Sequence, residues 1–598
     1  QAKGLRKVHL ADLLSGATAK HQKQRAKILA QKINTEHNKR MWWFIQRTVK
    51  DPPHKQVLKV QRIVDGKVVD YTTKEEVEWA VQKECEIRFT MAHSAPIMKT
   101  LLGEKLKYLS DQELAAQIIM GTWDIPADLE PASRMILEKV GEMGIKIVNG
   151  EGKEIIISPP DFKRFWKKVN ESTSSSARGL HYGHYKASTQ CDFSSRLHAQ
   201  QLTVIARSDV SPERWPVSLQ VLLEKIIGVC LVERLRAIQL YEADWNFFNQ
   251  FVFGQEALNE LEAAGYLPEE LFSQRGSTAE DATLDKVLTA NISIQTRHPI
   301  VVISADAKYC YDCVNLCIMA LVWLVLVQHF GAIYVTFFCL SSMKFYQRTG
   351  YGDSTTYFGG EGLKRWIMGL GQGNRAAPPS WVQLSSVLVC ILRDMGMGAQ
   401  IEDPFTREII HTIGALFVDD TDLYVWKEYL RSGAELWPVA QEELSWWGKL
   451  IIATGGGLKA EKSFCSLLDY ECVEGEWQIL ENVELPPMLV PNSDGTWSEI
   501  ASVSPMKASK TLGTMTSLAG GSAEQLTKLR QKFDEWLKRM KNGHLPAHMG
   551  WVGYRLQLWP GLRYGIGTMT NDLEAAQEVF EGTDYKLLNI LGTAKTIK

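Results

Sequence analysis

Three aspartates stand where they could bind divalent metal ions. Asp306 follows the apolar run Ile300–Ile303, which we expect to be a buried strand, and the pair Asp419-Asp420 separates two β-rich runs. Two strands joined at a tight acidic turn form a hairpin whose tip carries both carboxylates. Adjacent carboxylates repel each other, so nearby cations would stabilise them. Taken singly, each aspartate is better explained as an ordinary turn residue, since Asp favours turns.

The three carboxylates would converge if their strands are neighbours in one sheet. Hard carboxylate oxygens suit Mg²⁺. Two such ions about 3.5–4 Å apart clamp the attacking and leaving oxygens of an in-line phosphoryl displacement. We therefore expect Asp306, Asp419 and Asp420 to hold two Mg²⁺ ions, or Mn²⁺ in their place, at a phosphoryl-transfer site.

A glycine-rich stretch, WIMGLGQGNRAAPPSW, lies between the acidic segments. It lacks both the full Gly-x-Gly-x-x-Gly pattern and the Lys-Ser/Thr ending of a phosphate loop, which argues against a mononucleotide-binding fold. Its glycines would instead let the backbone approach a substrate closely, with Gln372 supplying an amide. Pro378 and Pro379 predict the start of a helix.

The elements that must position these residues indicate a mixed fold. Residues 1–150 are expected to be mostly helical, with a hairpin turning at Asp65-Gly66 and a following helix capped by Thr73. Short β-rich segments then alternate with long helices up to about residue 470, which predicts an α+β domain. The apolar stretch Leu316–Val327 is short for a membrane span and typical of a buried helix. We predict a basic N-terminal extension (1–150), a catalytic region (151–520) and a helical C-terminal region (521–598).

Charge and cysteine content give weaker evidence of function than these motifs do. The formal net charge of −2 decides nothing, because nucleic-acid binding depends on local patches. Basic runs do occur in residues 1–50 and 528–541, although such runs are more often solvated helix faces. The ten cysteines are scattered, which favours a reducing intracellular setting. The one cluster, Cys310, Cys313 and Cys317, lacks a fourth zinc ligand at suitable spacing and is expected to pack in the core.

Taken in order, these motifs resemble those of reverse transcriptases, specifically of retroelements without long terminal repeats, and are also similar to the group II intron type. The resemblance covers roughly residues 155–520. Asp306 with Tyr311-Asp312 resembles the first palm motif, and Phe417–Asp420 matches the aromatic-x-Asp-Asp motif. The other matches are Gly369, Gln372, Gly373 and Pro378 (Gly-x-x-Gln-Gly…Pro), the segment GGGLKAEKSF, and the hairpin Thr511-Leu512-Gly513.

The resemblance implies roles for individual residues. Lys462 would lie near the departing pyrophosphate as a general acid, and Lys225 and Arg236 would contact the triphosphate. The ring of Tyr311 would collide with a 2′-hydroxyl, the group that separates RNA from DNA precursors. Gln372 and Gly373 would shape the nucleotide pocket.

The same resemblance implies a right-hand polymerase with fingers, a ferredoxin-like βαββαβ palm and a helical thumb. Its activity would be RNA-directed DNA synthesis for a retrotransposon, adding dNTPs to a primer 3′-hydroxyl. The expected partners are an RNA template and a DNA primer or target-site DNA, without a membrane or an organic cofactor. We expect an intracellular, nuclear protein that is not secreted.

Three departures from the family pattern bear on activity. Ala377 stands where a small polar residue is usual, Arg375 replaces a common Pro, and Ala237 replaces the Pro of Arg-Pro-Ile. The three metal-binding aspartates are intact, which favours an active enzyme over the alternative of a domesticated or inactive nucleic-acid-binding protein. An RNA-directed RNA polymerase is the less favoured alternative, because the corresponding viral motif is usually Gly-Asp-Asp.

Overall fold

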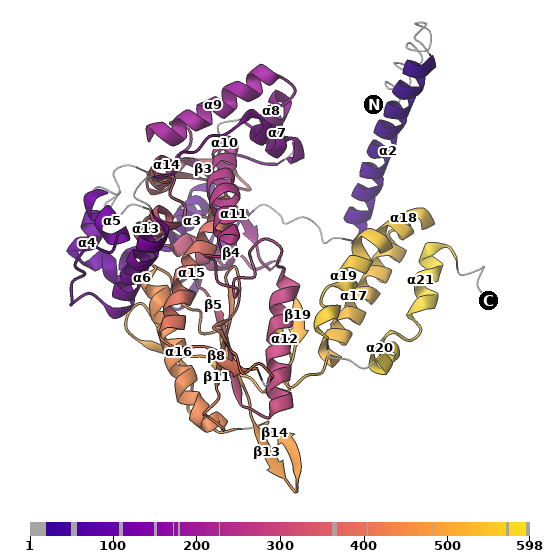
Figure 1. The fold of residues 1–598 in the computed structure, drawn as a ribbon. Helices are drawn as coiled ribbons and strands as arrows, with labels where there is room; N and C mark the ends of the chain where they lie inside the picture. Colours follow the sequence, from indigo (N-terminus) through magenta and orange to yellow (C-terminus); the bar gives the residue numbers. More distant parts are fainter. Residues whose placement is uncertain are drawn as a thin grey trace. The chain divides into compact units, whose positions relative to one another are not determined.

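The chain folds into a mixture of helices and sheets, which confirms the predicted α+β class (Figure 1). This computed structural model describes residues 19–49, 57–106, 112–148, 152–171, 173–176, 180–226, 228–360, 367–403, 405–481, 483–569 and 573–593. It divides into two compact units, one of residues 54–507 and one of residues 1–53 with 508–598. The boundaries of these units differ from those of the three predicted regions, 1–150, 151–520 and 521–598. The assignment of those regions stays a prediction.

A seven-stranded sheet in the larger unit carries Asp306 and Asp420. Its strand order is β17-β12-β5-β11-β8-β9, with β10 paired to β11 beside this path. At the centre, β5 is antiparallel to both β11 and β12. The strands are β5 (Ile300–Asp306), β8 (Ala399–Glu402), β9 (Ile409–Thr412), β10 (Gly414–Phe417), β11 (Asp420–Lys427), β12 (Phe464–Leu468) and β17 (Ala501–Ser502).

Several helices pack around this sheet. α16 (Gly433–Ala453) packs on β5 and β11, and α13 (Leu316–Leu326) and α15 (Ala377–Asp394) pack together in the same core. α13 is buried over almost its whole length, which confirms the predicted core helix. α12 (Ala279–Thr296) packs against β10 and sends Lys286 to the β11 side chain Asp422. Among the described residues, no helix is long and apolar enough to cross a membrane.

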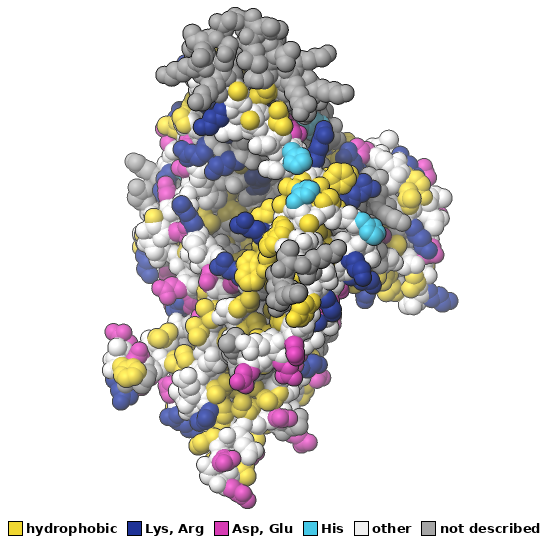
Figure 2. Space-filling model, turned by 90° about the vertical axis from the view of Figure 1, so that its right-hand side faces the viewer, with side chains coloured by type: hydrophobic (Ala, Val, Ile, Leu, Met, Phe, Trp, Pro, Cys, Tyr) yellow, Lys and Arg dark blue, Asp and Glu magenta, His cyan; other side chains and the backbone are white. Residues whose placement is uncertain are grey.

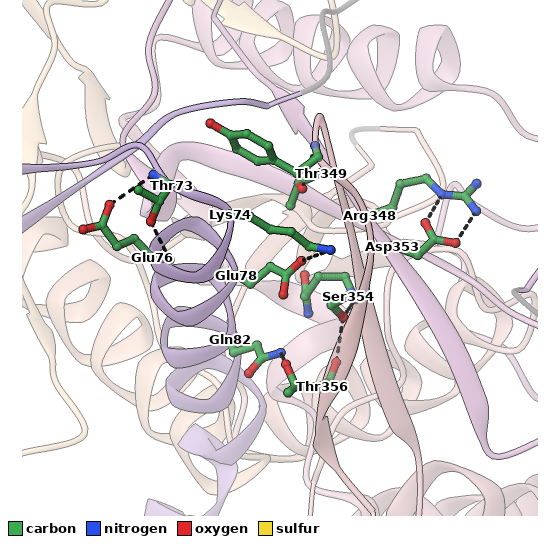
Figure 3. Close-up of polar contacts among 12 residues, drawn as sticks. Thr73, Lys74, Glu76, Glu78, Gln82, Arg348, Thr349, Asp353, Ser354 and Thr356 are labelled. Carbon is green, nitrogen blue, oxygen red and sulfur yellow. Dashed lines mark hydrogen bonds and ion pairs between the residues drawn. The ribbon is translucent and has the colours of Figure 1, made fainter.

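A second sheet, of order β4-β3-β6-β7, supports an N-terminal helix. Its strands are β3 (Val217–Glu224), β4 (Leu235–Leu240), β6 (Lys344–Thr349) and β7 (Gly352–Gly359), and the helix is α3 (Lys74–Thr90). Figure 3 shows α3 beside this sheet, with the Gln82 side chain donating to Thr356 Oγ1 at 2.9 Å. The predicted cap is confirmed, because Thr73 and Glu76 form a reciprocal capping box.

The remaining elements of the larger unit surround these two sheets. The predicted hairpin is confirmed, with Asp65 and Gly66 both at positive φ (50° and 74°), as a type I′ turn requires. The strands are β1 (Val60–Val64), β2 (Lys67–Tyr71), β13 (Tyr470–Val473), β14 (Glu476–Ile479), β15 (Leu489–Pro491) and β16 (Trp497–Glu499). The helices are α4 (Leu101–Leu106), α5 (Gln112–Ile119), α6 (Pro131–Ile147), α7 (Pro159–Lys168), α8 (Tyr182–Ser188), α9 (Asp192–Ser208), α10 (Ala243–Asn249), α11 (Leu258–Ala263) and α14 (Phe330–Ser341).

Surface charge is uneven over the larger unit. The β13–β14 hairpin at the lower end of Figure 1 carries Glu471, Glu474 and Glu476. Figure 2 shows Asp and Glu side chains at the same lower end. This hairpin is therefore a poor surface for a polyanion.

The smaller unit is mostly helical, as predicted for the C-terminal region. The side chains of Leu529, Phe533, Trp536, Leu537 and Met540 on α17 form its core. The elements are α2 (Ala19–Val49), β18 (Ser509–Thr511), β19 (Thr514–Thr516), α17 (Ala523–Asn542), α18 (Ala547–Gly553), α19 (Trp559–Arg563), α20 (Leu573–Phe580) and α21 (Thr583–Leu591). In the segment Thr511-Leu512-Gly513, Thr511 ends β18 and Leu512 and Gly513 form the turn to β19. The Leu512 carbonyl accepts a hydrogen bond from the Tyr564 hydroxyl.

A buried ion pair stabilises the sheet two residues behind the strand ends. Lys286 Nζ lies 3.0 Å from Asp422 Oδ2, and the Lys286 side chain is only 3% exposed. Ser304 on the neighbouring strand also donates to Asp422. Removing one partner of such a pair leaves a buried charge without compensation, whereas replacing both partners by apolar groups is often tolerated.

Lys286→Met should therefore destabilise the larger unit by about 3 kcal/mol, because Asp422 loses its counter-ion. The double variant Lys286→Met/Asp422→Leu should recover most of this loss. Denaturant unfolding monitored by tryptophan fluorescence measures both effects. A single variant as stable as the original chain would show that the pair contributes nothing.

Candidate active site

The structure brings the three predicted metal ligands to one end of adjacent strands. Asp306 and Asp420 are direct cross-strand partners of β5 and β11, and Asp419 precedes Asp420 in the turn. Side chains opposite each other in an antiparallel pair are neighbours, with Cβ atoms about 4.5–5.5 Å apart. Asp306 is half-buried, whereas Asp419 and Asp420 are exposed. Within the described parts of the chain, no group of three or more His, Cys, Asp or Glu side chains lies close enough together to hold a metal ion.

Two lysines face Asp306 from the loop before β12. Lys459 Nζ lies 3.5 Å from Asp306 Oδ1, and Lys462 Nζ lies 3.6 Å from Asp306 Oδ2. The backbone holds this loop in place. The Lys459 N–H donates to the Asp306 carbonyl at 2.9 Å, and the Asp306 N–H donates to Ser463 Oγ at 3.1 Å. The loop that carries both lysines is thus fixed to the strand that carries the carboxylate.

The other predicted phosphate-binding residues belong to the same basic group. Lys225 directly follows β3, and Arg236 lies on β4, its antiparallel partner. Burial lowers the pKa of Lys225, and the positive charges of Lys459, Lys462, Arg236 and Arg88 lower it further. A group of neighbouring cations favours an anionic ligand, because the ligand's negative charge offsets their mutual repulsion. Lys225, Arg236 and Lys462, which were singled out from the sequence, therefore lie in one electrostatic neighbourhood.

The turn that carries Asp419 is strained. Val418 has φ +58°, a conformation that a β-branched residue rarely adopts and that costs on the order of 1–3 kcal/mol. Two residues from distant parts of the chain hold this turn in place. The indole N–H of Trp381 on α15 donates to the Val418 carbonyl at 2.5 Å, and the Val418 N–H donates to Ser273 Oγ at 3.3 Å.

Tyr311 lies close to this turn. Its ring stands edge-on to that of Trp381, with centroids 6.2 Å apart. Burial raises the pKa of Tyr311, and the nearby Cys310 and Asp419 raise it further. The hydroxyl is therefore neutral at physiological pH and adds no charge beside the carboxylates.

The glycine-rich loop connects Tyr311 with β4. The Leu370 N–H donates to the Tyr311 carbonyl at 2.7 Å, and the Gln239 N–H donates to the Gln372 carbonyl at 2.7 Å. A Cβ atom at Gly369 would lie 2.5 Å from the Asp312 carbonyl oxygen, and one at Gly373 would lie 2.2 Å from that of Gln239. These glycines let the loop pass close to the protein's own backbone. That they also let it approach a substrate stays a prediction.

The three departures from the family pattern have different surroundings. Ala237 and Ala377 are each only 1% exposed and pack in the main core, so both small side chains have a structural role. The Arg375 guanidinium bonds to Gln250 and lies 5.0 Å from the ring centroid of Phe165. Arg375 thus joins α7 to the segment that follows α10.

Several residues of the site were not singled out from the sequence. Lys459 could have been found, because it lies three residues before Lys462 in the same loop. Trp381, Ser273 and Arg88 left no such signal, since each reaches the site through contacts between distant segments. The buried cysteines Cys310, Cys313 and Cys317 confirm the expectation of core packing, and the thiols of Cys313 and Cys317 donate to backbone carbonyls.

Comparison with known proteins found neither a family model that matches this chain nor a curated protein similar to it.

The contact between Trp381 and Val418 gives a direct test of how the turn is held. Trp381→Phe keeps an aromatic ring beside Tyr311 but removes the donor to the Val418 carbonyl, a loss of about 1 kcal/mol. We expect faster hydrogen exchange in residues 413–423, measured by mass spectrometry. Trp437→Phe is the matched control, because its indole donates to the Pro486 carbonyl at 2.9 Å, away from this turn. Equal exchange in both variants would show that Trp381 does not hold the turn.

Proposed function

We propose that this chain is an RNA-directed DNA polymerase of a retroelement, which adds dNTPs to a primer 3′-hydroxyl. The observation that carries the proposal is the pairing of Asp306 with Asp420, next to Asp419 and facing a basic group that includes Lys459 and Lys462. Carboxylates that can hold metal ions, beside cations that can hold phosphates, suit phosphoryl transfer.

The topology around the carboxylates supports a polymerase palm. Apart from β6 and β7 before α15 and β8 and β9 after it, the chain runs β5, helices α13 to α15, β10, β11, α16 and β12. These four strands lie in the order β12-β5-β11-β10. This is a βαββαβ arrangement of the ferredoxin-like kind. The four-stranded sheet that carries Lys225 and Arg236 would then belong to the fingers, and the helices of the smaller unit would form the thumb.

The donor set fits divalent metal ions. Asp306, Asp419 and Asp420 offer only hard carboxylate oxygens, and Asp419 and Asp420 are exposed to incoming ions. When bound, two Mg²⁺ or Mn²⁺ ions would supply activation of the primer hydroxyl and neutralisation of the developing charge. Lys225 and Arg236 would orient the triphosphate. The side chain of Lys462 is 50% exposed and can turn toward the departing pyrophosphate to donate a proton.

Tyr311 and its neighbours support DNA rather than RNA synthesis. The ring lies beside Trp381 and near Asp419, and its own carbonyl is fixed by the Leu370 N–H. A ring held in this way beneath a nucleotide sugar would exclude a 2′-hydroxyl. The proposed partners are an RNA template and a DNA primer or target-site DNA, which for a retrotransposon places the enzyme in the nucleus.

The activity is tested by primer extension on poly(rA)/oligo(dT) with Mg²⁺. The intact chain should incorporate dTTP, and Asp419→Asn should lose about three orders of magnitude in rate, because a metal ligand is lost. Asp494→Asn, an exposed turn residue on the β15–β16 hairpin, is the control and should retain full activity. Tight RNA binding without dTTP incorporation would instead indicate a nucleic-acid-binding protein. Incorporation of UTP but not dTTP would indicate an RNA polymerase.

Sugar selection by Tyr311 is tested separately. Tyr311→Ala should raise incorporation of UTP relative to dTTP by about tenfold or more, the change that a loss of ~1.4 kcal/mol of discrimination produces. Tyr311→Phe keeps the ring and should discriminate as the original chain does. The ratio of kcat/KM values for the two nucleotides is the measurement. An unchanged ratio in Tyr311→Ala would refute the assignment while leaving the polymerase itself in place.

A further inference from the structure

Helix α3 brings a buried cation to the back of the candidate active site. The Arg88 side chain is only 6% exposed, and its Nη1 lies 3.8 Å from Oδ2 of Asp312, which is 1% exposed. The guanidinium carbon also lies 4.6 Å from the ring centroid of Tyr309. Asp312 directly follows Tyr311 in the chain. The positive charge of Arg88 thus lies behind Tyr311, the residue assigned to sugar selection.

The end of α3 contacts two segments of the site through its backbone. The Arg88 carbonyl accepts a bond from Cys313 Sγ at 3.7 Å, and the Phe89 carbonyl accepts one from the Met368 N–H at 2.9 Å. Cys313 ends the short helix Cys310–Cys313, and Met368 leads into the glycine-rich loop. Arg88 therefore stands where both segments meet α3.

The segment behind Tyr311 needs such support. Tyr309 and Cys310 both have positive φ, 58° and 34°, which is a strained conformation for residues other than glycine. Burial raises the pKa of Asp312 to about 6, while Arg88 and then the Gln372 backbone amide oppose that rise. Without Arg88, the carboxylate would lose the largest of the interactions that keep it charged. The glycine-rich loop is joined to the same segment through its backbone, because the Leu370 N–H donates to the carbonyl of Tyr311, the residue before Asp312, at 2.7 Å.

We propose that Arg88 is a positioning residue of the nucleotide site: by pairing with Asp312 it fixes Tyr311 and the loop Gly369–Gly373 in one arrangement. The inference rests on the proposed polymerase function. Helix α3 has further anchors on its support, among them the bond from Gln82 to Thr356 in Figure 3 and that from Tyr351 to the Thr72 carbonyl. The helix should therefore stay docked when Arg88 is changed.

The test compares variants of the full chain that differ only in this pair. Arg88→Met removes the charge, Arg88→Lys keeps it, and Arg88→Met/Asp312→Asn makes both partners neutral. Lys83→Met is the matched control on α3, because Lys83 forms an exposed ion pair with Glu86 at 3.0 Å. Hydrogen exchange of residues 307–314 and 367–374 is read by mass spectrometry, without nucleic acid or nucleotide.

We expect Arg88→Met to speed exchange in both segments by about tenfold, and the double variant to recover at least half of this change on a logarithmic scale. A change of that size corresponds to ~1.4 kcal/mol. Arg88→Lys and Lys83→Met should resemble the original chain. Where Arg88→Met fails to fold, folding of the double variant with near-original exchange supports the pairing equally. Unchanged exchange in Arg88→Met, or a double variant as impaired as the single one, overturns the proposal.

Incorporation of dTTP and UTP by the same variants separates this proposal from the proposed function. Arg88→Met should lose about tenfold in kcat/KM discrimination between the two sugars, chiefly through KM, because the pocket rather than the metal site is disturbed. An original chain that does not polymerise refutes the polymerase, while the exchange measurement still decides whether Arg88 holds the two segments. An active original chain whose discrimination is unchanged in Arg88→Met overturns the role of Arg88 alone.

Discussion

The register between β5 and β11 is the constraint on which the candidate site depends. Asp306 lies opposite Asp420, and two residues further back Ser304 lies opposite Asp422. A slip of one residue would turn every β11 side chain to the other face of the sheet. The alternate residues Leu423 and Val425 are buried in the main core. Burial of these two side chains on one face therefore favours the register in which the carboxylates stand on the other.

Charge of both signs is concentrated around this pair of strands and comes from separate parts of the chain. The carboxylates belong to the central sheet, Lys225 and Arg236 to the four-stranded sheet, and Lys459 and Lys462 to the loop before β12. Each charge alone would be costly where water is partly excluded, and each group of charges reduces the cost of the group of opposite sign. The lysines at Asp306 offset carboxylate repulsion, and Lys286 does the same for Asp422 deeper in the sheet.

Local signals in the sequence predicted the elements, and long-range pairing determined what the sequence could not show. The Asp65-Gly66 turn, the Thr73 cap, the apolar helix α13 and the hairpin at Asp419-Asp420 each depend on neighbouring residues and were predictable. The pairing of Arg88 with Asp312 and the bond from Trp381 to Val418 join distant segments, which leave no periodicity or spacing to read. Even the convergence of Asp306 with Asp420 could be stated only on the condition that their strands are neighbours.

The left-handed conformation of Val418 lowers the stability of the fold but keeps Asp419 in a defined position. Glycine adopts that conformation without penalty, so a search for stabilised variants would favour it there. The same exchange would give the turn more freedom and loosen the placement of Asp419. Selection for robustness and selection for a precisely placed Asp419 would then act on residue 418 in opposite directions.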